Sequence, residues 1–271
     1  MSAAPPLACP FCEGRGFIRE ALYTAPPKGE VAFSFNTGAY HRELYRCRGC
    51  GHFRSIHGMD MTGLYEGDYV RSTYGGAGLG ASFEKIVALA PGTSDNRQRV
   101  RRVCAYARPR PGKPTLLDVG SGLCVFPHAM KNEGWDCTAL DPDRNAVRHA
   151  EEKAGVKGLY GDFMEINIPG RFDLITFNKV LEHVDDPIAM LSRARTNLDA
   201  DGMVYLEVPD GEEAFRESPK REEFFIDHPH IFSAASTALL CHRAGFALQT
   251  LERLREPSGK YTLYAFLTAL D

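Results

Sequence analysis

The chain has 271 residues, of which 44% are hydrophobic and 25% charged, which suits one globular α/β domain with a small appendage. The formal net charge of −3 gives no indication that the protein surface as a whole binds polyanions such as nucleic acids. No apolar run reaches the roughly 18 residues that a membrane span needs, and the first residues lack the basic and apolar regions of a signal peptide. We therefore expect a cytoplasmic protein with reduced cysteines.

Two C-x-x-C pairs, Cys9/Cys12 and Cys47/Cys50, stand near the start of the chain. Each pair can turn tightly enough for both thiolates to face one ion, and four cysteine thiolates are typical of a tetrahedral zinc site. Because four protein ligands leave no open position, we expect this zinc to be structural. The alternative is four free, buried cysteines.

Strand-like, aromatic segments at 31–35 and 40–46 separate the two pairs, and we expect them to form the hairpins of a zinc ribbon over residues 1–58. We expect His41, His52 and His57 to lie on its surface or to pack within it. Residues 59–80 combine glycines with Tyr65, Tyr69 and Tyr74. Such a stretch cannot build a core, so it predicts either a lid over a ligand site or a plain linker.

Two helices are predicted next, at 82–90 and, after a Ser94-Asp95 cap, at 97–106. Val100 and Val103 lie on one face of the second helix at helical spacing, and its arginines fall largely on the other face. We expect that arginine face to be solvated; the alternative is a nucleic-acid patch.

Residues 115–119 form an apolar run without clear alternation that leads into a glycine turn, which predicts a strand buried on both faces of a parallel sheet. Gly120 and Gly122 let the backbone bend sharply and approach a ligand closely. The free N–H groups of a helix at 125–133 would face that turn. A strand, a glycine turn and a helix predict a nucleotide-type site at the carboxyl edge of the sheet.

The rest of the chain alternates strands with helices, which predicts a doubly wound, Rossmann-like α/β sheet. We expect helices at 143–154, 187–197 and 233–244. We expect strands at 135–140, 156–160, 172–177, 202–208, 246–251 and 261–267. The polar stretch 210–227, with Phe215, Phe224 and Phe225, reads as an insertion over an acceptor site.

A dinucleotide fingerprint needs a third glycine where this chain has Val125. The sequence Asp118-x-Gly120-Ser121-Gly122 instead resembles the first motif of the class I S-adenosylmethionine (SAM) methyltransferases. The resemblance implies that the acid and the glycine loop hold the amino acid end of SAM. Later motifs at the expected intervals extend the implied cofactor site to Asp141, Pro142, Asp162, Phe163 and Asn178.

Asp141, at the tip of the second strand, can accept hydrogen bonds from both ribose hydroxyls, the role that the family assigns to this acid. The family places a pair like Asp162-Phe163 beside the adenine; the alternative is that Asp162 is only a turn residue. Asn178 opens the segment Asn-Lys-Val-Leu-Glu-His-Val-Asp-Asp-Pro, which resembles the segment after the fourth strand in small-molecule methyltransferases, near the reactive methyl group.

His183, within this segment, is the candidate general base, because histidine titrates in the range that a hydroxyl acceptor requires. The alternative is that it packs or contacts SAM. Asp185 and Asp186 suggest either a divalent metal or the cap of the helix at Pro187. His230 lies in a His-x-Phe-Ser element that family members carry near the acceptor, so it is a second catalytic candidate; the alternative is that it anchors a turn.

The resemblance implies a class I methyltransferase domain over 81–271, with a seven-stranded sheet whose last strand is antiparallel, behind a four-cysteine zinc ribbon. This arrangement is similar to bacterial methyltransferases that modify sugars in surface glycans or secondary metabolites. We do not find the extra C-terminal domain of the larger sugar C-methylating relatives, so we expect a hydroxyl acceptor. The rival interpretations are an RNA methyltransferase that docks its substrate on the ribbon, a non-catalytic module that binds SAM or a nucleotide, and a dehydrogenase.

Overall fold

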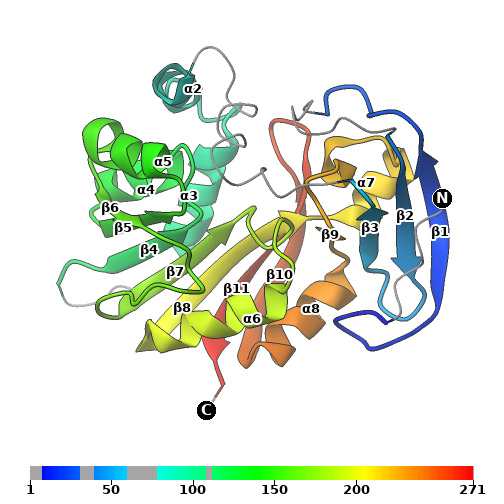
Figure 1. The fold of residues 1–271 in the computed structure, drawn as a ribbon. Helices are drawn as coiled ribbons and strands as arrows, with labels where there is room; N and C mark the ends of the chain where they lie inside the picture. The colour runs from blue at the N-terminus through cyan, green and yellow to red at the C-terminus, as the bar shows by residue number, and fades with distance from the viewer. Residues whose placement is uncertain (1–7, 31–39, 60–77, 108–111, 271) are drawn as a thin grey trace.

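The computed structural model describes residues 8–30, 40–59, 78–107 and 112–270. Within these ranges it contains a seven-stranded sheet and a four-stranded sheet (Figure 1). The strand expected at 31–35 and Tyr65, Tyr69 and Tyr74 of the connector lie outside the described residues. None of the helices in the described ranges is both long enough and apolar enough to cross a bilayer.

The large sheet follows the order β10-β11-β8-β7-β4-β5-β6. The strands β4 to β8 pair in parallel, whereas β11 runs antiparallel to both of its neighbours. This order confirms the predicted seven-stranded sheet with an antiparallel last strand. The strands are β4 (Thr115–Val119), β5 (Asp136–Asp141), β6 (Lys157–Tyr160), β7 (Phe172–Asn178), β8 (Leu198–Pro209), β10 (Phe246–Arg255) and β11 (Tyr261–Ala269).

Helices cover both faces of this sheet (Figure 1). One face carries α2 (Gly78–Val87), α3 (Asp95–Tyr106), α4 (Val125–Asn132) and α5 (Arg144–His149), which continues as the π-helical turn η3 (Ala150–Ala154). The other face carries α6 (Pro187–Arg193), followed by the 3-10 turn η4 (Ala194–Thr196), and α8 (Ala234–Arg243).

Neighbouring residues of the central strands belong to different core clusters, which explains why the apolar residues of β4 do not alternate with polar ones. Leu116 packs with Leu174 in the cluster under α3 and α4, whereas Leu117 packs with Ile175 in the cluster under α6 and α8. Successive side chains of a strand point to opposite faces, so a strand covered on both sides needs apolar residues at nearly every position.

The small sheet consists of β1 (Phe17–Tyr23), β2 (Arg42–Cys47), β3 (Phe53–His57) and the two-residue strand β9 (His230–Ile231). The first three are the antiparallel strands of the N-terminal ribbon, and β9 pairs with β3 from the far end of the chain. The ribbon sheet is therefore completed by a strand that lies in sequence between β8 and β10 of the large sheet. The domain boundaries at 58 and 80 stay a prediction.

The segment after β8 packs on the ribbon, and its expected position over an acceptor site stays a prediction. It forms α7 (Gly211–Glu217) and the 3-10 turn η5 (Glu222–Phe224). The rings of Phe215 and Phe224 lie 5.3 and 5.4 Å from that of Phe53 in β3. Phe224 belongs to the hydrophobic core at the ribbon, and Phe215 packs against that core.

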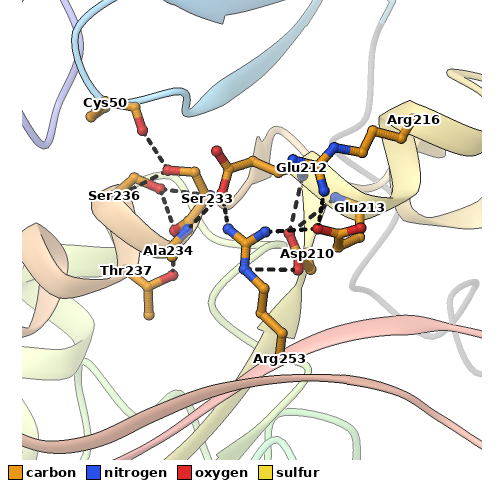
Figure 2. Close-up of polar contacts among 10 residues, drawn as sticks. All are labelled: Cys50, Asp210, Glu212, Glu213, Arg216, Ser233, Ala234, Ser236, Thr237 and Arg253. Carbon is orange, nitrogen blue, oxygen red and sulfur yellow. Dashed lines mark hydrogen bonds and ion pairs between the residues drawn. The ribbon is translucent and has the colours of Figure 1, made fainter.

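Polar contacts hold the ribbon at the same junction, as Figure 2 shows. The hydroxyl of Ser233, the N-cap of α8, donates to the carbonyl oxygen of Cys50. Nearby, the guanidinium of Arg253 reaches the carboxylates of Asp210, Glu212 and Glu213. The second cysteine knuckle is thereby attached to the start of α8.

Candidate functional site

The carboxyl ends of β4, β5 and β6 are joined by backbone and side-chain hydrogen bonds that centre on Asp141. The amide of Gly122 donates to Asp141 Oδ2 at 2.8 Å, and the amide of Gly161 donates to the Asp141 carbonyl oxygen at 3.2 Å. The amide of Gly120 donates to the carbonyl oxygen of Leu140 at 2.8 Å. The glycine turn and the turn after β6 therefore lie on either side of one acid.

The first glycine of the turn is required by both conformation and space. Gly120 has a φ of +68°, which side chains rarely adopt, and a Cβ there would lie 2.9 Å from Cγ2 of Val180. Ser121 closes the turn, since its hydroxyl donates to the carbonyl oxygen of Asp118 at 2.8 Å. Val180 thus packs the segment after β7 against the glycine turn.

Asp118 is a buried acid whose charge is supported by neighbours on β7. Its Oδ1 accepts hydrogen bonds from Thr176 Oγ1 at 2.5 Å and from Asn178 Nδ2 at 2.8 Å. Burial raises the pKa of Asp118 to about 6, although these hydrogen bonds lower it. A ligand that places a positive charge beside this carboxyl would favour its ionised form.

Asp141 is also buried, and its two carboxylate oxygens accept from the amides of Gly122 and Asp143, the latter at 2.9 Å. Burial raises its pKa, and these two backbone hydrogen bonds oppose the rise. Each carboxylate oxygen has a second lone pair, so further donors such as hydroxyls can still bind. Pro142 follows as an exposed residue at the tip of β5.

The turn after β6 places its two candidate residues differently. Asp162 is exposed, and its Oδ1 accepts from the amide of Met164 at 2.7 Å, as in the turn-residue alternative. Phe163 is buried, with its ring edge-on to Phe177 at 5.6 Å. The structure thus brings Asp162 to the edge where Asp118 and Asp141 lie, and it packs the ring of Phe163 into the core below.

His183 lies across from the glycine turn, in a cluster with a second histidine. Its Nδ1 is 2.9 Å from the carbonyl oxygen of Asp227, and its ring lies 4.7 Å from that of His228. Candidate ligand atoms of Glu182, His183 and His228 all lie within 4.8 Å of one another. Sequence reasoning missed His228, because no spacing rule connects it with a Glu-His pair more than forty positions earlier.

His230 is held between the ribbon and the large sheet. Its ring is buried; Nδ1 lies 3.1 Å from His52 Nε2, and Nε2 accepts from Arg54 Nη1 at 2.9 Å. Burial and the neighbouring Arg54 lower the pKa of His230 to about 3. These contacts match the anchoring alternative; the catalytic role stays a prediction. His52 packs inside the ribbon junction rather than on its surface.

Two arginines of α3 contradict the expected solvated face. Arg99 and Arg102 form ion pairs with the buried Glu207 of β8, at 2.5 and 2.8 Å, and their side chains are only 12% and 16% exposed. Burial alone would raise the pKa of Glu207, but Arg99 and its neighbouring cations hold it well below its usual value. A single sequence could not reveal this pairing, since the partners are more than a hundred residues apart.

The four predicted zinc ligands converge. Sγ of Cys9 lies 3.5 Å from Sγ of Cys50, Sγ of Cys12 lies 3.4 Å from Sγ of Cys47, and all four sulfurs lie within 4.8 Å of one another. Zinc–sulfur bonds of ~2.3 Å in a tetrahedron place the sulfurs roughly 3.8 Å apart. The thiolates therefore fit a zinc ion.

Comparison with known proteins agrees with this geometry. The methyltransferase domain family matches residues 93–251, more than half of the chain. The ubiquinone biosynthesis O-methyltransferase of Actinobacillus pleuropneumoniae serotype 5b (strain L20) is 29% identical over 101 residues, which are 33% of this chain and 43% of that protein. The match thus spans less than half of the relative's length.

Among solved structures, the magnesium protoporphyrin IX methyltransferase of Synechocystis PCC 6803 with bound S-adenosylhomocysteine (SAH) is similar, with a TM-score of 0.58 at 15% identity over 78% of this chain and 100% of that one. The glycopeptide N-methyltransferase MtfA has a TM-score of 0.52 at 15% identity over 67% of this chain and 92% of that one. Such likenesses show a shared fold. The sheet order, the glycine turn and the matched residues together show that the chain belongs to the methyltransferase domain family.

Proposed function

We propose that the protein is a SAM-dependent methyltransferase whose acceptor is a hydroxyl group of a small molecule, most specifically of a sugar or glycan precursor. The observation that carries this proposal is the meeting of Asp118, the glycine turn and Asp141 at one edge of the sheet, with His183 on the adjoining turn. Family membership supports the reaction. The O-methyltransferase relatives support oxygen as the accepting atom, and the sugar rests on the resemblance seen in the sequence.

SAM supplies an electrophilic methyl group on a sulfonium. The chain's own part is to bind and orient it. In the proposal, Asp118 and the turn Gly120 to Gly122 hold the amino acid end, Asp141 accepts from the ribose hydroxyls, and Asp162 lies beside the adenine. The cationic end of the ligand then stabilises the ionised form of Asp118, which burial otherwise disfavours.

His183 acts on the acceptor. A carbonyl oxygen only accepts hydrogen bonds, so the contact with the Asp227 carbonyl fixes the proton of His183 on Nδ1. Nε2 then carries a lone pair and can act on the proton of an acceptor hydroxyl. Asn178 at the end of β7 contacts Asp118, and Val180 lies against Gly120, which supports a position of this nitrogen near the expected methyl group.

We also propose that Cys9, Cys12, Cys47 and Cys50 hold a structural zinc ion. The convergence of four sulfurs supports it. A four-thiolate site offers no coordination position to a substrate, so its part is to fix the two knuckles and the ribbon strands between them.

The test is a turnover assay with isotope-labelled SAM against pools of sugars and sugar nucleotides, with RNA as a parallel substrate. We expect label in the small-molecule fraction and loss of that label with Asp118→Asn. Label in RNA, with an affinity that falls steeply with salt, would instead favour a nucleic-acid enzyme. SAM binding without transfer to any pool would favour a non-catalytic module.

A further inference from the structure

The side chains of Glu182, His183 and His228 form a cluster beside the proposed acceptor position, and the proposed methyl transfer uses only His183 of the three. Glu182 and His183 follow β7, and His228 precedes β9, so the cluster joins two segments that are far apart in the chain. One candidate ligand atom from each lies within 4.8 Å of the other two. This cluster shares no residue with the four cysteines of the ribbon.

Both imidazole rings are fixed in the same tautomer. The Nδ1 atoms of His183 and His228 each lie 2.9 Å from a backbone carbonyl oxygen, those of Asp227 and Glu223 respectively. Because a carbonyl can only accept, Nδ1 must be the protonated nitrogen, and Nε2 of each ring carries the lone pair. Histidines that bind metals are oriented by this kind of hydrogen bond from the second ring nitrogen.

The carboxylate of Glu182 supplies an independent indication. Glu182 is 1% exposed, and its Oε2 is buried without a hydrogen-bond partner among the residues that the structure describes. A buried carboxylate oxygen without a donor or cation is costly. The nearby cationic side chain Lys179 donates to Thr262 Oγ1 at 2.6 Å. The carboxylate thus has an open acceptor in a cluster of two imidazoles.

We propose that Glu182, His183 and His228 bind a divalent transition-metal cation such as Zn²⁺, Mn²⁺ or Fe²⁺. Two imidazole nitrogens and one carboxylate oxygen suit these ions and leave coordination positions open. Metal–ligand bonds of roughly 2.1 Å require ligand atoms no more than about 4.2 Å apart, so the cluster contracts by several tenths of an ångström on binding. The carboxylate of Asp227, 4.0 Å from His228 Nε2, adds negative charge beside the ion.

The role of the cation rests on the proposed function. An acceptor hydroxyl that occupies an open coordination position becomes more acidic and releases its proton to solvent. The resulting alkoxide attacks the methyl carbon, the carbon–sulfur bond breaks, and the methyl ether and SAH are the products. His183 then acts on the acceptor as a ligand of the ion and does not itself take the proton.

The test titrates Co²⁺ and Mn²⁺ into the full chain with its ribbon loaded with one equivalent of zinc. We expect one further equivalent to bind, and the Co²⁺ spectrum to show d–d bands without the thiolate charge-transfer bands of a cysteine site. Glu182→Gln and His228→Gln should each weaken this binding at least about tenfold. His242→Gln, at an exposed residue near the end of α8, is the matched control and should bind as the wild type does.

The absence of a second equivalent, or unchanged binding in Glu182→Gln, overturns the proposal. SAM affinity and the zinc retained by the ribbon, measured on the same samples together with the melting temperature, show that both parts of each variant are folded, so lost metal binding cannot be misread as unfolding. Metal binding needs no turnover and is therefore judged separately from the proposed function. Methyl transfer by a protein that binds no second ion would leave the methyltransferase proposal in place, with His183 as the general base.

Discussion

The donor side and the acceptor side of the proposed site are built in different ways. On the donor side, the bond from Gly122 to Asp141 spans 19 residues and that from Asn178 to Asp118 spans 60, and both lie within the large sheet. On the acceptor side, the bond from His183 to Asp227 spans 44 residues, and the contact of His52 with His230 spans 178 and joins the ribbon to the segment after β8. The donor side therefore forms within the large sheet, whereas the acceptor side also involves the segment that packs on the ribbon.

The largest effect is expected from Cys47→Ser, which removes one zinc ligand from the ribbon. Structural zinc contributes about 10–16 kcal/mol in zinc-finger peptides, so the ribbon should lose its zinc and unfold. Because the donor side is built within the large sheet, SAM affinity should change less than about twofold. Zinc content and calorimetric titration with SAM measure the two effects.

Cys104→Ser is the matched control, since Cys104 lies on α3, outside the four-sulfur cluster. Zinc retained at one equivalent with an unchanged melting temperature would contradict the four-thiolate site. Loss of SAM binding together with the zinc would show that the donor side also depends on the folded ribbon.

Glu207→Gln tests the buried charges between α3 and β8. The substitution leaves Arg99 without its carboxylate partner and Arg102 with only Glu256 at 3.8 Å, and breaking such a buried network costs roughly 3–5 kcal/mol. Denaturant unfolding measures the loss, and Glu165→Gln at an exposed turn is the control. A change below about 1 kcal/mol would show that the arginine face is effectively solvated.

Asp141→Ala should weaken SAM binding by roughly 1–3 kcal/mol, because the ribose hydroxyls would lose their hydrogen bonds to the buried carboxylate. Calorimetric titration with SAM measures the affinity. Asp136→Ala, at the opposite end of β5, should leave it unchanged. Equal affinity of wild type and Asp141→Ala would remove this acid from the site.

The smallest effect is the pH dependence that Asp118 confers. Its folded pKa of about 6 exceeds the unfolded value of 3.8, so the native state binds more protons between those values. The contribution of Asp118 to stability therefore declines as pH rises through this window.

SAM affinity should instead fall as pH falls, by up to about tenfold one pH unit below the pKa of Asp118, since the ionised acid is required for binding. A flat profile in Asp118→Asn is the expected control result, and an equally flat wild-type profile would exclude Asp118 from contact with the cationic ligand.

The sequence predicted the parts of the molecule that depend on local pattern. The mostly apolar run of β4, the conformational demand at Gly120 and the cap at Ser233 each specify their element within a few residues, and the structure has all three. The antiparallel last strand was predictable because the family resemblance supplied the order of the sheet.

The parts that sequence reasoning missed depend on pairings between distant residues. The sequence could not show that Phe224 packs against Phe53 of β3, and Arg102 was expected to be solvated although it pairs with Glu207 of β8. His228 can be recognised as a candidate metal ligand only because the structure places it close to Glu182 and His183. An amphipathic or charged pattern marks a side chain as polar, but the tertiary fold decides which partner it meets.

A crystal structure of the full chain with SAH would show whether the carboxyl edge of the large sheet holds the cofactor. We expect ribose hydroxyls within hydrogen-bond distance of the Asp141 carboxylate, the amino acid end on the turn Gly120 to Gly122, and the sulfur facing the turn that carries His183. SAH bound elsewhere, or bound with its ribose away from Asp141, would contradict it.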